Sequence, residues 1–310
     1  MEIKILPTVN DNHVFKPEMG KKMTDLITRF QSFLDEDEID SLVTETYKIL
    51  SHCTNPKLLK EQDVTHLTVG YVQSGKTMSF TALTALAADN GYRIIIYLAG
   101  TKNNLLSQTT KRLTKDLIAE SQYNNLYKIF ENPTLSKSSE IRNKLRLSTK
   151  PTILITVLKH HIHIGELSAI FKSTIIQQEL GKQGVLIIDD EADQASLNGF
   201  SYVNTKKAAI SDEWDEETDN KESSTYSSIL NLRTTIPNHS YVQYTATPQG
   251  PLLISIMDLL SPKSHTVLTP GKKYTGGKTF FRDFPDLVIS IPDEEVYHYK
   301  NNPLVHVPNS

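Results

Sequence analysis

Residues 67–77 read LTVGYVQSGKT, a short run of β-forming residues that leads into the phosphate-binding pattern G-x-x-x-x-G-K-[ST]. In this pattern successive backbone N–H groups surround the phosphates of a nucleotide, the lysine reaches the outer phosphates, and the threonine hydroxyl holds Mg²⁺. We therefore expect a nucleotide-binding loop. Its contact residues are Gly70, Gln73, Ser74, Gly75, Lys76 and Thr77.

The residues after this loop predict a helix. Residues 78–88 are rich in Ala, Leu and Thr, and Gly91 follows as a C-terminal cap. The N-terminus of such a helix carries partial positive charge and unpaired N–H groups, and both favour a bound anion. The alternative is an ordinary glycine-containing turn between a strand and a helix, and the acidic motif at 189–193 argues against it.

That acidic motif ends the stretch VLIIDDEAD, in which acids follow an apolar run. The run predicts a buried parallel strand, and open α/β sheets bind ligands at the carboxyl ends of such strands. One carboxylate there can hold Mg²⁺ through water, and the next can orient and deprotonate an attacking water. We assign the first role to Asp190 and the second to Glu191, with Lys76 as the third catalytic residue. Asp189 has no assigned role, because the strand can extend through it.

We assign no catalytic or metal-binding role to two other acidic stretches. Residues 35–40 follow no apolar strand and are interpreted as a solvated turn between two helical patterns. Residues 212–222 hold several acids around Trp214, which predicts an exposed insertion between the acidic motif and the next strand. A partner-docking segment around Trp214 is the alternative for this insertion.

The stretch YVQYTATP at 241–248 alternates β-forming residues and stops at a proline, so it predicts another strand. Thr245 and Thr247 lie at the end of that strand. Small hydroxyl residues at a strand end beside the acids can relay the state of the γ-phosphate. We expect these two threonines to couple the nucleotide state to the rest of the chain.

In chain order, GKT at 75–77, DEAD at 190–193 and TAT at 245–247 resemble motifs I, II and III of superfamily-two helicases. The longer strings GYVQSGKT, IIDDEAD and YTATP are similar to those of the Z-one domain proteins, a family associated with endonuclease function and bacterial phage defence. The resemblance covers residues 62–282, with Gln73 where many helicases have glycine. It implies a RecA-like P-loop ATPase, ATP and Mg²⁺ as cofactors, nucleic acid as a partner, and a companion nuclease or other defence subunit.

Strand and helix patterns alternate along the chain. They predict an α/β, three-layer fold with a mostly parallel sheet covered on both faces. The expected strands are 66–70, 93–98, 152–157, 185–189 and 241–245, and the expected helices beside them are 77–89, 102–119, 137–147, 164–172 and 223–233. We expect three regions, namely an N-terminal arm and helical cap at 1–60, the ATPase lobe at 61–260, and a proline-rich connector at 261–310.

Composition narrows the class of protein. The chain of 310 residues suffices for one large α/β domain with an appended piece, and its net charge of −3 excludes a globally basic nucleic-acid binder. No apolar run is long enough to cross a membrane, and the N-terminus lacks the pattern of a signal peptide. The single cysteine, Cys53, excludes an internal disulfide, and no neighbouring base supports it as a nucleophile. We expect a cytoplasmic protein.

Nucleic-acid contacts are predicted after the second and third strands. The candidates after the second strand are Gly100, Thr101, Asn104, Gln108 and Arg112. A small strand end followed by amides and a basic group suits backbone phosphates, although Thr101 as a helix cap beside a solvated polar face is an equal alternative. Thr156 and Lys159 are the candidates after the third strand. DNA is favoured over RNA.

Two functions of different classes remain open. One is a motor lobe that couples Mg-ATP hydrolysis to nucleic-acid engagement, and the other is a nucleotide-gated module that recruits a nuclease or other partner without translocation. Helicase-type motors close ATP between two RecA-like halves, and the second half supplies arginine fingers.

About sixty residues follow the third motif, fewer than a second lobe needs. We therefore expect slow hydrolysis by this chain alone, or an arginine from another subunit of an oligomer. An endonuclease role for the chain itself is disfavoured, because no Glu-x-Lys pair follows Asp286 at a suitable spacing.

Overall fold

A computed structural model of the chain describes residues 15–58, 62–71, 75–181, 183–194, 224–253, 260–276 and 279–287. Residues 1–271 form one compact unit and residues 272–310 form a second, and each is described by itself. In the second unit the described residues include a π-helical turn at Thr279–Asp283 and a 3₁₀ turn at Pro285–Leu287. Within these described ranges, no helix has both the length and the apolar character needed to cross a membrane.

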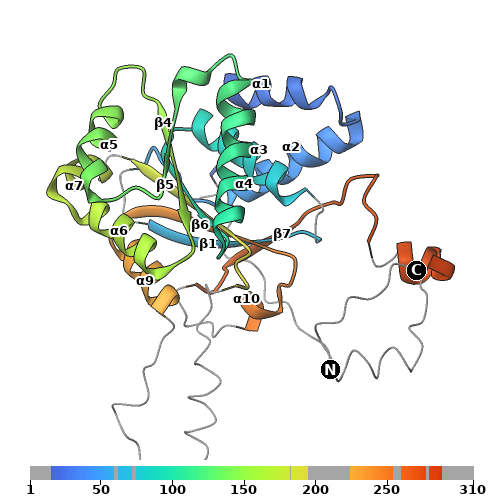
Figure 1. Cartoon of the computed structure of the whole chain (residues 1–310). Helices are drawn as coiled ribbons and strands as arrows, with labels where there is room; N and C mark the ends of the chain where they lie inside the picture. Colours follow the sequence, from blue (N-terminus) through green and yellow to red (C-terminus); the bar gives the residue numbers. More distant parts are fainter. Residues whose placement is uncertain are drawn as a thin grey trace, which may run out of the picture. The chain divides into compact units, whose positions relative to one another are not determined.

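In the described part of the first unit, seven strands form one sheet in the order β3-β4-β2-β5-β6-β1-β7, and every hydrogen-bonded pair is parallel (Figure 1). The strands are β1 (Gln62–Val69), β2 (Tyr92–Ala99), β3 (Tyr127–Glu131), β4 (Thr152–Leu158), β5 (Gly184–Asp190), β6 (Asn238–Thr245) and β7 (Ser264–Val267). Their carboxyl ends therefore lie at one edge of the sheet. The strands that lead into the two predicted motifs, β1 and β5, are not neighbours, because β6 lies between them.

Helices cover both faces of this sheet (Figure 1). One face carries α1 (Lys21–Phe30), α2 (Glu36–Ser51), α3 (Lys76–Asp89) and α4 (Asn103–Thr114), and the other carries α5 (Ser138–Leu145), α6 (His161–Lys172), α7 (Thr174–Leu180) and α9 (Ser224–Thr234). Along β2, Ile95 belongs to the core under the first group of helices, while Ile94 and Ile96 belong to the core under the second. Burial on both faces explains why these strands are apolar without alternation. The predicted α/β fold with a parallel sheet is confirmed.

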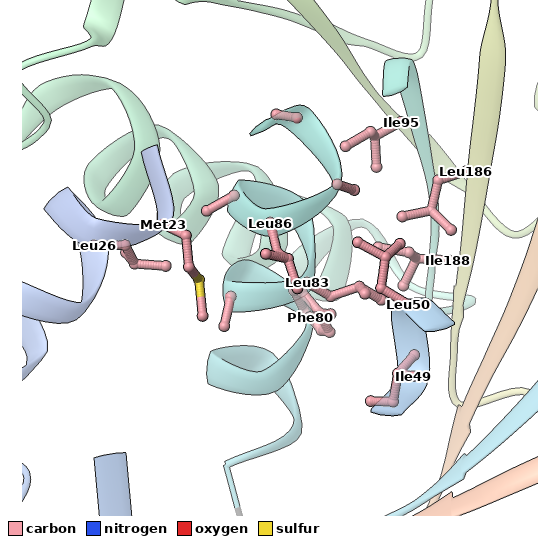
Figure 2. Close-up of a cluster of buried hydrophobic side chains, with 14 of the residues drawn as sticks. Met23, Leu26, Ile49, Leu50, Phe80, Leu83, Leu86, Ile95, Leu186 and Ile188 are labelled. Atoms are coloured by element: carbon pink, nitrogen blue, oxygen red, sulfur yellow. The ribbon is translucent and has the colours of Figure 1, made fainter. Parts of the chain in front are cut away.

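Helix α3 is the buried centre of its layer (Figure 2). Small side chains, including Ala82, Ala85 and Ala87, let it fit between the other helices and the sheet. Figure 2 shows its Phe80, Leu83 and Leu86 among Met23 and Leu26 of α1, Ile49 and Leu50 of α2, and Ile95, Leu186 and Ile188 of the sheet. Truncation of one such buried leucine costs about 2–5 kcal/mol. The core thus fixes the helix whose N-terminus carries the predicted phosphate loop.

The N-terminal helices share this core and are tied to the end of α3. The Asp89 carboxylate accepts hydrogen bonds from the backbone N–H groups of Gly20 (3.1 Å), Lys22 (3.1 Å) and Met23 (2.9 Å). These bonds satisfy donors that the first turn of α1 would otherwise leave open. A side chain at Gly20 would collide with this carboxylate, since its Cβ would lie 2.5 Å from Asp89 Cγ.

The acids at 35–40 do not form the expected turn. Asp35 is the N-cap of α2, where its side chain accepts from the Glu38 N–H (3.0 Å) and the Glu38 carboxylate accepts from the Asp35 N–H (3.1 Å). This reciprocal capping box, followed by acids in the first turn, complements the positive end of the helix. The stretch starts a helix and does not interrupt one.

All five expected strands are present, whereas β3, β7 and α7 were not predicted. β3 is a five-residue strand at one edge of the sheet, and β7, at the other edge, has four residues. The position of β7 is fixed by His66 of β1, whose ring nitrogens lie 2.7 Å from the Ser264 hydroxyl and 3.0 Å from the Thr266 hydroxyl. The sheet therefore continues past residue 260, where the lobe was expected to end.

Candidate functional site

The phosphate loop is the segment 70–77, and its last two residues begin helix α3. Gly75 adopts a left-handed conformation (φ +98°), and Lys76 and Thr77 are the first two residues of the helix. Because glycine has no side chain, the residue before the helix does not cap it, and the first N–H groups remain suited to an anion. Two further loop candidates, Gln73 and Ser74, lie outside the described residues.

The acid loop, residues 190–194, begins at the last residue of β5. Asp189 is fully buried inside the strand, and Asp190 is the last strand residue. Glu191 then takes a left-handed conformation (φ +56°), and the Gln194 N–H donates to its carbonyl oxygen (2.8 Å). Such a conformation costs a non-glycine residue about 1 kcal/mol or more, so the contacts around the loop must hold it in place.

Strand β6 positions both loops. The Gly70 N–H of the phosphate loop donates to the Thr245 carbonyl (3.0 Å), and the Ala192 N–H of the acid loop donates to the Tyr244 carbonyl (2.9 Å). Consecutive carbonyls of a strand point to opposite sides, so one reaches the loop after β1 and the other reaches the loop after β5. The two loops therefore lie on either side of a single strand. Because neighbouring strands are about 4.7–4.9 Å apart, the strands that lead into the two loops are separated by about 9–10 Å.

The charges of the two loops interact. Burial raises the pKa of Asp190 to about 6; Lys159 opposes this rise, Glu191 adds to it, and Lys76 opposes it. Lys76 of the phosphate loop thus lies close enough to the acid loop to stabilise its carboxylate. A magnesium–triphosphate site needs a lysine and acids in the same neighbourhood.

The last acid of the motif contacts the end of β6. The hydroxyls of Thr245 and Thr247 each donate to the Asp193 carboxylate at 2.6 Å. Burial alone would raise the pKa of Asp193, but these two hydrogen bonds hold the pKa below its ordinary value. The two predicted coupling threonines therefore face an acid that sequence reasoning had left without a role.

Lys159 requires a correction. It is 2% exposed and lies at the end of β4, where its ammonium contacts Asp189 and the acid loop. A buried ammonium with these partners does not face a nucleic-acid strand, so its prediction as a nucleic-acid contact is wrong. Thr156 is also fully buried, with its hydroxyl 2.9 Å from that of Thr110.

The other nucleic-acid candidates lie after β2. Thr101, Asn104, Gln108 and Arg112 are exposed, and the last three are spaced four residues apart on one face of α4. Lys102 occupies the N-cap position, which removes the alternative role of Thr101 as the cap. Gly100 is buried with φ +48°, and a Cβ there would lie 2.6 Å from Leu105 Cδ1.

Arg112 also reaches the phosphate loop. Its Nη1 donates to Thr77 Oγ1 at 2.9 Å. This hydroxyl oxygen is the atom that the sequence assigns to Mg²⁺. The basic end of the exposed face of α4 therefore lies beside the candidate nucleotide site.

No protein-family model matches this chain, and no curated protein matches it in sequence. Similar solved structures include the Hef helicase domain of Pyrococcus furiosus, with 14% identity, a TM-score of 0.38, and coverage of 67% of this chain and 35% of that one. A DUF1998 helicase, MrfA, bound to DNA and AMPPNP has 14% identity and a TM-score of 0.46, with 84% of this chain and 32% of that one covered. Mss116p bound to ssRNA and AMP-PNP has 13% identity and a TM-score of 0.43, with 85% and 46% covered.

The chain thus spans less than half the length of each of these structures. Identities and scores this low say nothing about what the chain binds or turns over. The resemblance to Z-one domain proteins stays a prediction.

Four residues outside the two loops complete the description of the predicted site. Burial raises the pKa of the Cys53 thiol to about 12, which disfavours the thiolate that a nucleophilic cysteine needs. Trp214 and the acids around it lie outside the described residues. Sequence reasoning missed the roles of Lys159 and Tyr241, whose hydroxyl donates to Asp189. The signal in the sequence was weak, because neither residue belongs to the acidic motif. Only the strand order shows that the side chains of both residues reach that motif.

Proposed function

We propose that the chain binds Mg-ATP between the phosphate loop and the acid loop and hydrolyses it, as the motor lobe of a helicase-like protein that acts on nucleic acid. The observation that carries this proposal is the attachment of both loops to consecutive carbonyls of β6, those of Tyr244 and Thr245. This attachment brings a helix N-terminus, a lysine and two carboxylates to the edge formed by the carboxyl ends of the strands. Ligands of open α/β sheets bind at that edge.

Each residue then has a distinct role. Lys76 contacts the outer phosphates, and the open N-terminus of α3 binds their oxygens. Glu191 orients the attacking water and accepts its proton. Asp190 remains the residue that would hold the metal, through one or more waters.

Magnesium suits the available ligands. Thr77 and Asp190 offer hard oxygen atoms, which Mg²⁺ prefers, and Mg²⁺ usually keeps waters and substrate phosphates in its shell. Within the described residues, no group of three His, Cys, Asp or Glu gathers that could hold a metal without a substrate. When bound, Mg²⁺ neutralises charge on the phosphates. The chain's own part is to place a hydroxyl and a carboxylate on either side of β6.

Coupling to nucleic acid would use two neighbouring features. Asp193 with Thr245 and Thr247 joins the acid loop to the end of β6, where a shift of the acids changes two hydrogen bonds. The exposed face of α4 offers Asn104 and Gln108 for backbone phosphates. Contacts of this kind give little sequence specificity.

Finer features follow from the motif resemblance, and we include them in the proposal. They are a Z-one domain identity, a part in bacterial anti-phage defence, DNA as the preferred nucleic acid, a companion nuclease or defence subunit, and a cytoplasmic location. A pull-down from a native host under ATP, followed by mass spectrometry, tests the companion. Recovery of no nuclease or defence protein in repeated experiments would remove that feature.

Titration calorimetry with ATP and Mg²⁺ tests the central claim. Wild-type chain and Lys57→Ala, an exposed lysine outside both loops, should bind ATP alike, whereas Lys76→Ala should lose binding. Glu191→Gln should bind ATP and fail to hydrolyse it, while Glu140→Gln on the exposed side of α5 should behave as wild type. Absence of binding heat in the wild-type chain would refute the nucleotide site.

Hydrolysis measured with and without DNA or RNA separates the two classes of function. Several-fold stimulation by nucleic acid supports the motor. ATP binding and slow turnover that nucleic acid does not change would support the nucleotide-gated module instead.

A further inference from the structure

The side chain of Lys159 is surrounded by oxygen atoms of one loop. It extends from the end of β4 and is 0% exposed. Its Nζ lies 2.6 Å from Asp189 Oδ1, 2.6 Å from the Asp190 carbonyl oxygen, 2.9 Å from that of Glu191 and 3.3 Å from that of Gln194. Three of these four acceptors are backbone carbonyls of the acid loop. The ammonium therefore contacts the backbone that carries the candidate catalytic acids.

The charge on this buried ammonium is balanced by one acid that does no chemistry. Asp189 is 0% exposed, its Oδ1 pairs with Lys159, and its Oδ2 accepts from the Tyr241 hydroxyl. A buried ion pair persists only when its remaining donors and acceptors are also satisfied. Each Asp189 oxygen has one partner, the charge of Lys159 at Oδ1 and the Tyr241 hydroxyl at Oδ2, and Asp190 and Glu191 are left as the acids available to a nucleotide.

The loop needs such an anchor because of its backbone. Glu191 lies in the left-handed region, which a residue with a side chain avoids unless its surroundings fix it. The Lys159 ammonium donates to the carbonyl oxygens on both sides of the Glu191 α-carbon, those of Asp190 and Glu191 itself. The backbone of Lys159 is itself fixed, since its N–H donates to the Gly100 carbonyl (2.9 Å).

We propose that Lys159 is a positioning residue, whose buried ammonium gathers the carbonyls of the acid loop and thereby sets the Glu191 carboxylate for water activation. This inference rests on the proposed function and extends it to a residue outside the three motifs. Lys159 touches neither nucleotide nor water in this role and acts through the loop. Its loss should lower the rate of hydrolysis and leave nucleotide binding intact.

The test uses the double variant Lys159→Met/Asp189→Asn in the full chain. Removal of both charges leaves no unpaired buried ion, and asparagine keeps an oxygen for the Tyr241 hydroxyl, so the fold should persist. The exposed Lys57→Met variant, outside both loops and α4, is the matched control. With the double variant we expect a thermal midpoint near that of wild type, a KM for ATP within about threefold, and a kcat lower by about 10–100-fold.

Hydrogen exchange provides a readout that does not depend on hydrolysis. The Ala192 N–H bonds to the Tyr244 carbonyl and the Gln194 N–H to the Glu191 carbonyl, so both amides report the loop conformation. They should exchange faster in the double variant than in wild type or in Lys57→Met. Exchange of amides in α3 should stay the same.

Each outcome decides the inference. Faster loop exchange with a reduced kcat and an unchanged KM supports positioning. A folded double variant with wild-type kcat overturns it, because a purely structural ion pair would be fully replaced. If the wild-type chain does not hydrolyse ATP, the proposed function fails. In that case hydrogen exchange at the Ala192 and Gln194 amides alone decides whether Lys159 holds the acid loop. Exchange rates equal to those of wild type would overturn the inference.

Discussion

The acid loop and the exposed face of α4 both follow the carboxyl end of a strand in one sheet, yet they are built in opposite ways. The acid loop is attached on every side, to Lys159, to the end of β6 and to two threonines. Asn104 and Gln108 on α4 are exposed. Under the proposed function, the groups assigned to chemistry are held in place and the groups assigned to nucleic-acid binding are accessible.

The largest effect should come from breaking the anchor of the acid loop without compensation. Lys159→Met alone leaves Asp189 buried and unpaired, which destabilises a fold by about 3–5 kcal/mol. Lys111→Met on the exposed face of α4 should change the free energy of unfolding by less than about 0.5 kcal/mol. Urea denaturation measures both. If Lys159→Met lowered the free energy of unfolding by less than about 1 kcal/mol, the acid loop would not be held more firmly than the face of α4, and the comparison would fail.

Asp190→Asn should raise stability and abolish the chemistry. The folded pKa of Asp190, about 6, lies above the ordinary value of 3.8, so the folded state binds more protons between these values. The free energy of unfolding therefore falls as the pH rises from about 4 to about 6, and the charged carboxylate is unfavourable above that range. Asparagine removes this charge and should add about 2–3 kcal/mol at pH 7.5.

This gain should disappear near pH 4, and urea titrations at the two pH values measure it. Mg²⁺-dependent hydrolysis by the wild type should decline as the pH falls through about 6, because a protonated Asp190 is a poor metal ligand. A gain that does not change with pH would show that Asp190 is not strained by burial.

Thr245→Val tests the link between the acid loop and β6. It removes one of the two hydroxyl donors to Asp193 and should cost about 1 kcal/mol. ATP binding should persist, and stimulation of hydrolysis by nucleic acid should fall several-fold because the acids and β6 no longer move together. Thr174→Val, at an exposed position on α7, is the control. Unchanged stimulation would separate this contact from coupling.

The smallest effect on stability should come from α4. Asn104→Ala/Gln108→Ala should leave the free energy of unfolding within about 0.5 kcal/mol and weaken nucleic-acid binding by about three- to tenfold. Fluorescence anisotropy at fixed salt measures the affinity. The exposed pair Asn143→Ala/Gln178→Ala is the matched control, and equal losses in both pairs would argue against a specific binding face.

Much of the fold could be predicted from the sequence. Apolar runs without alternation identified five strands, because burial on both faces leaves a strong pattern. The short edge strands β3 and β7 carry no such pattern, since they have only five and four residues. The acids at 35–40 were misread because their role is to cap a helix, which depends on a bond between side chain and backbone.

The misassignment of Lys159 has a different cause. A lysine after an apolar strand looks like an exposed cation, and its partner Asp189 is thirty residues away in the chain. Only the strand order, which places β2 between β4 and β5, shows that a long side chain can cross from one strand end to the next loop. Spacing along the chain does not contain that information.

The attachment of both loops to β6 has a further consequence. Insertion of one residue in β6 before Tyr244 would keep a backbone carbonyl at each position of the strand, because every residue carries one, but it would move each following side chain to the opposite face of the sheet. The Thr245 hydroxyl would then no longer face the Asp193 carboxylate, although the acid loop itself had not changed in sequence. The register of this middle strand therefore decides whether the acid loop keeps its side-chain contacts, independently of the sequence of the loop.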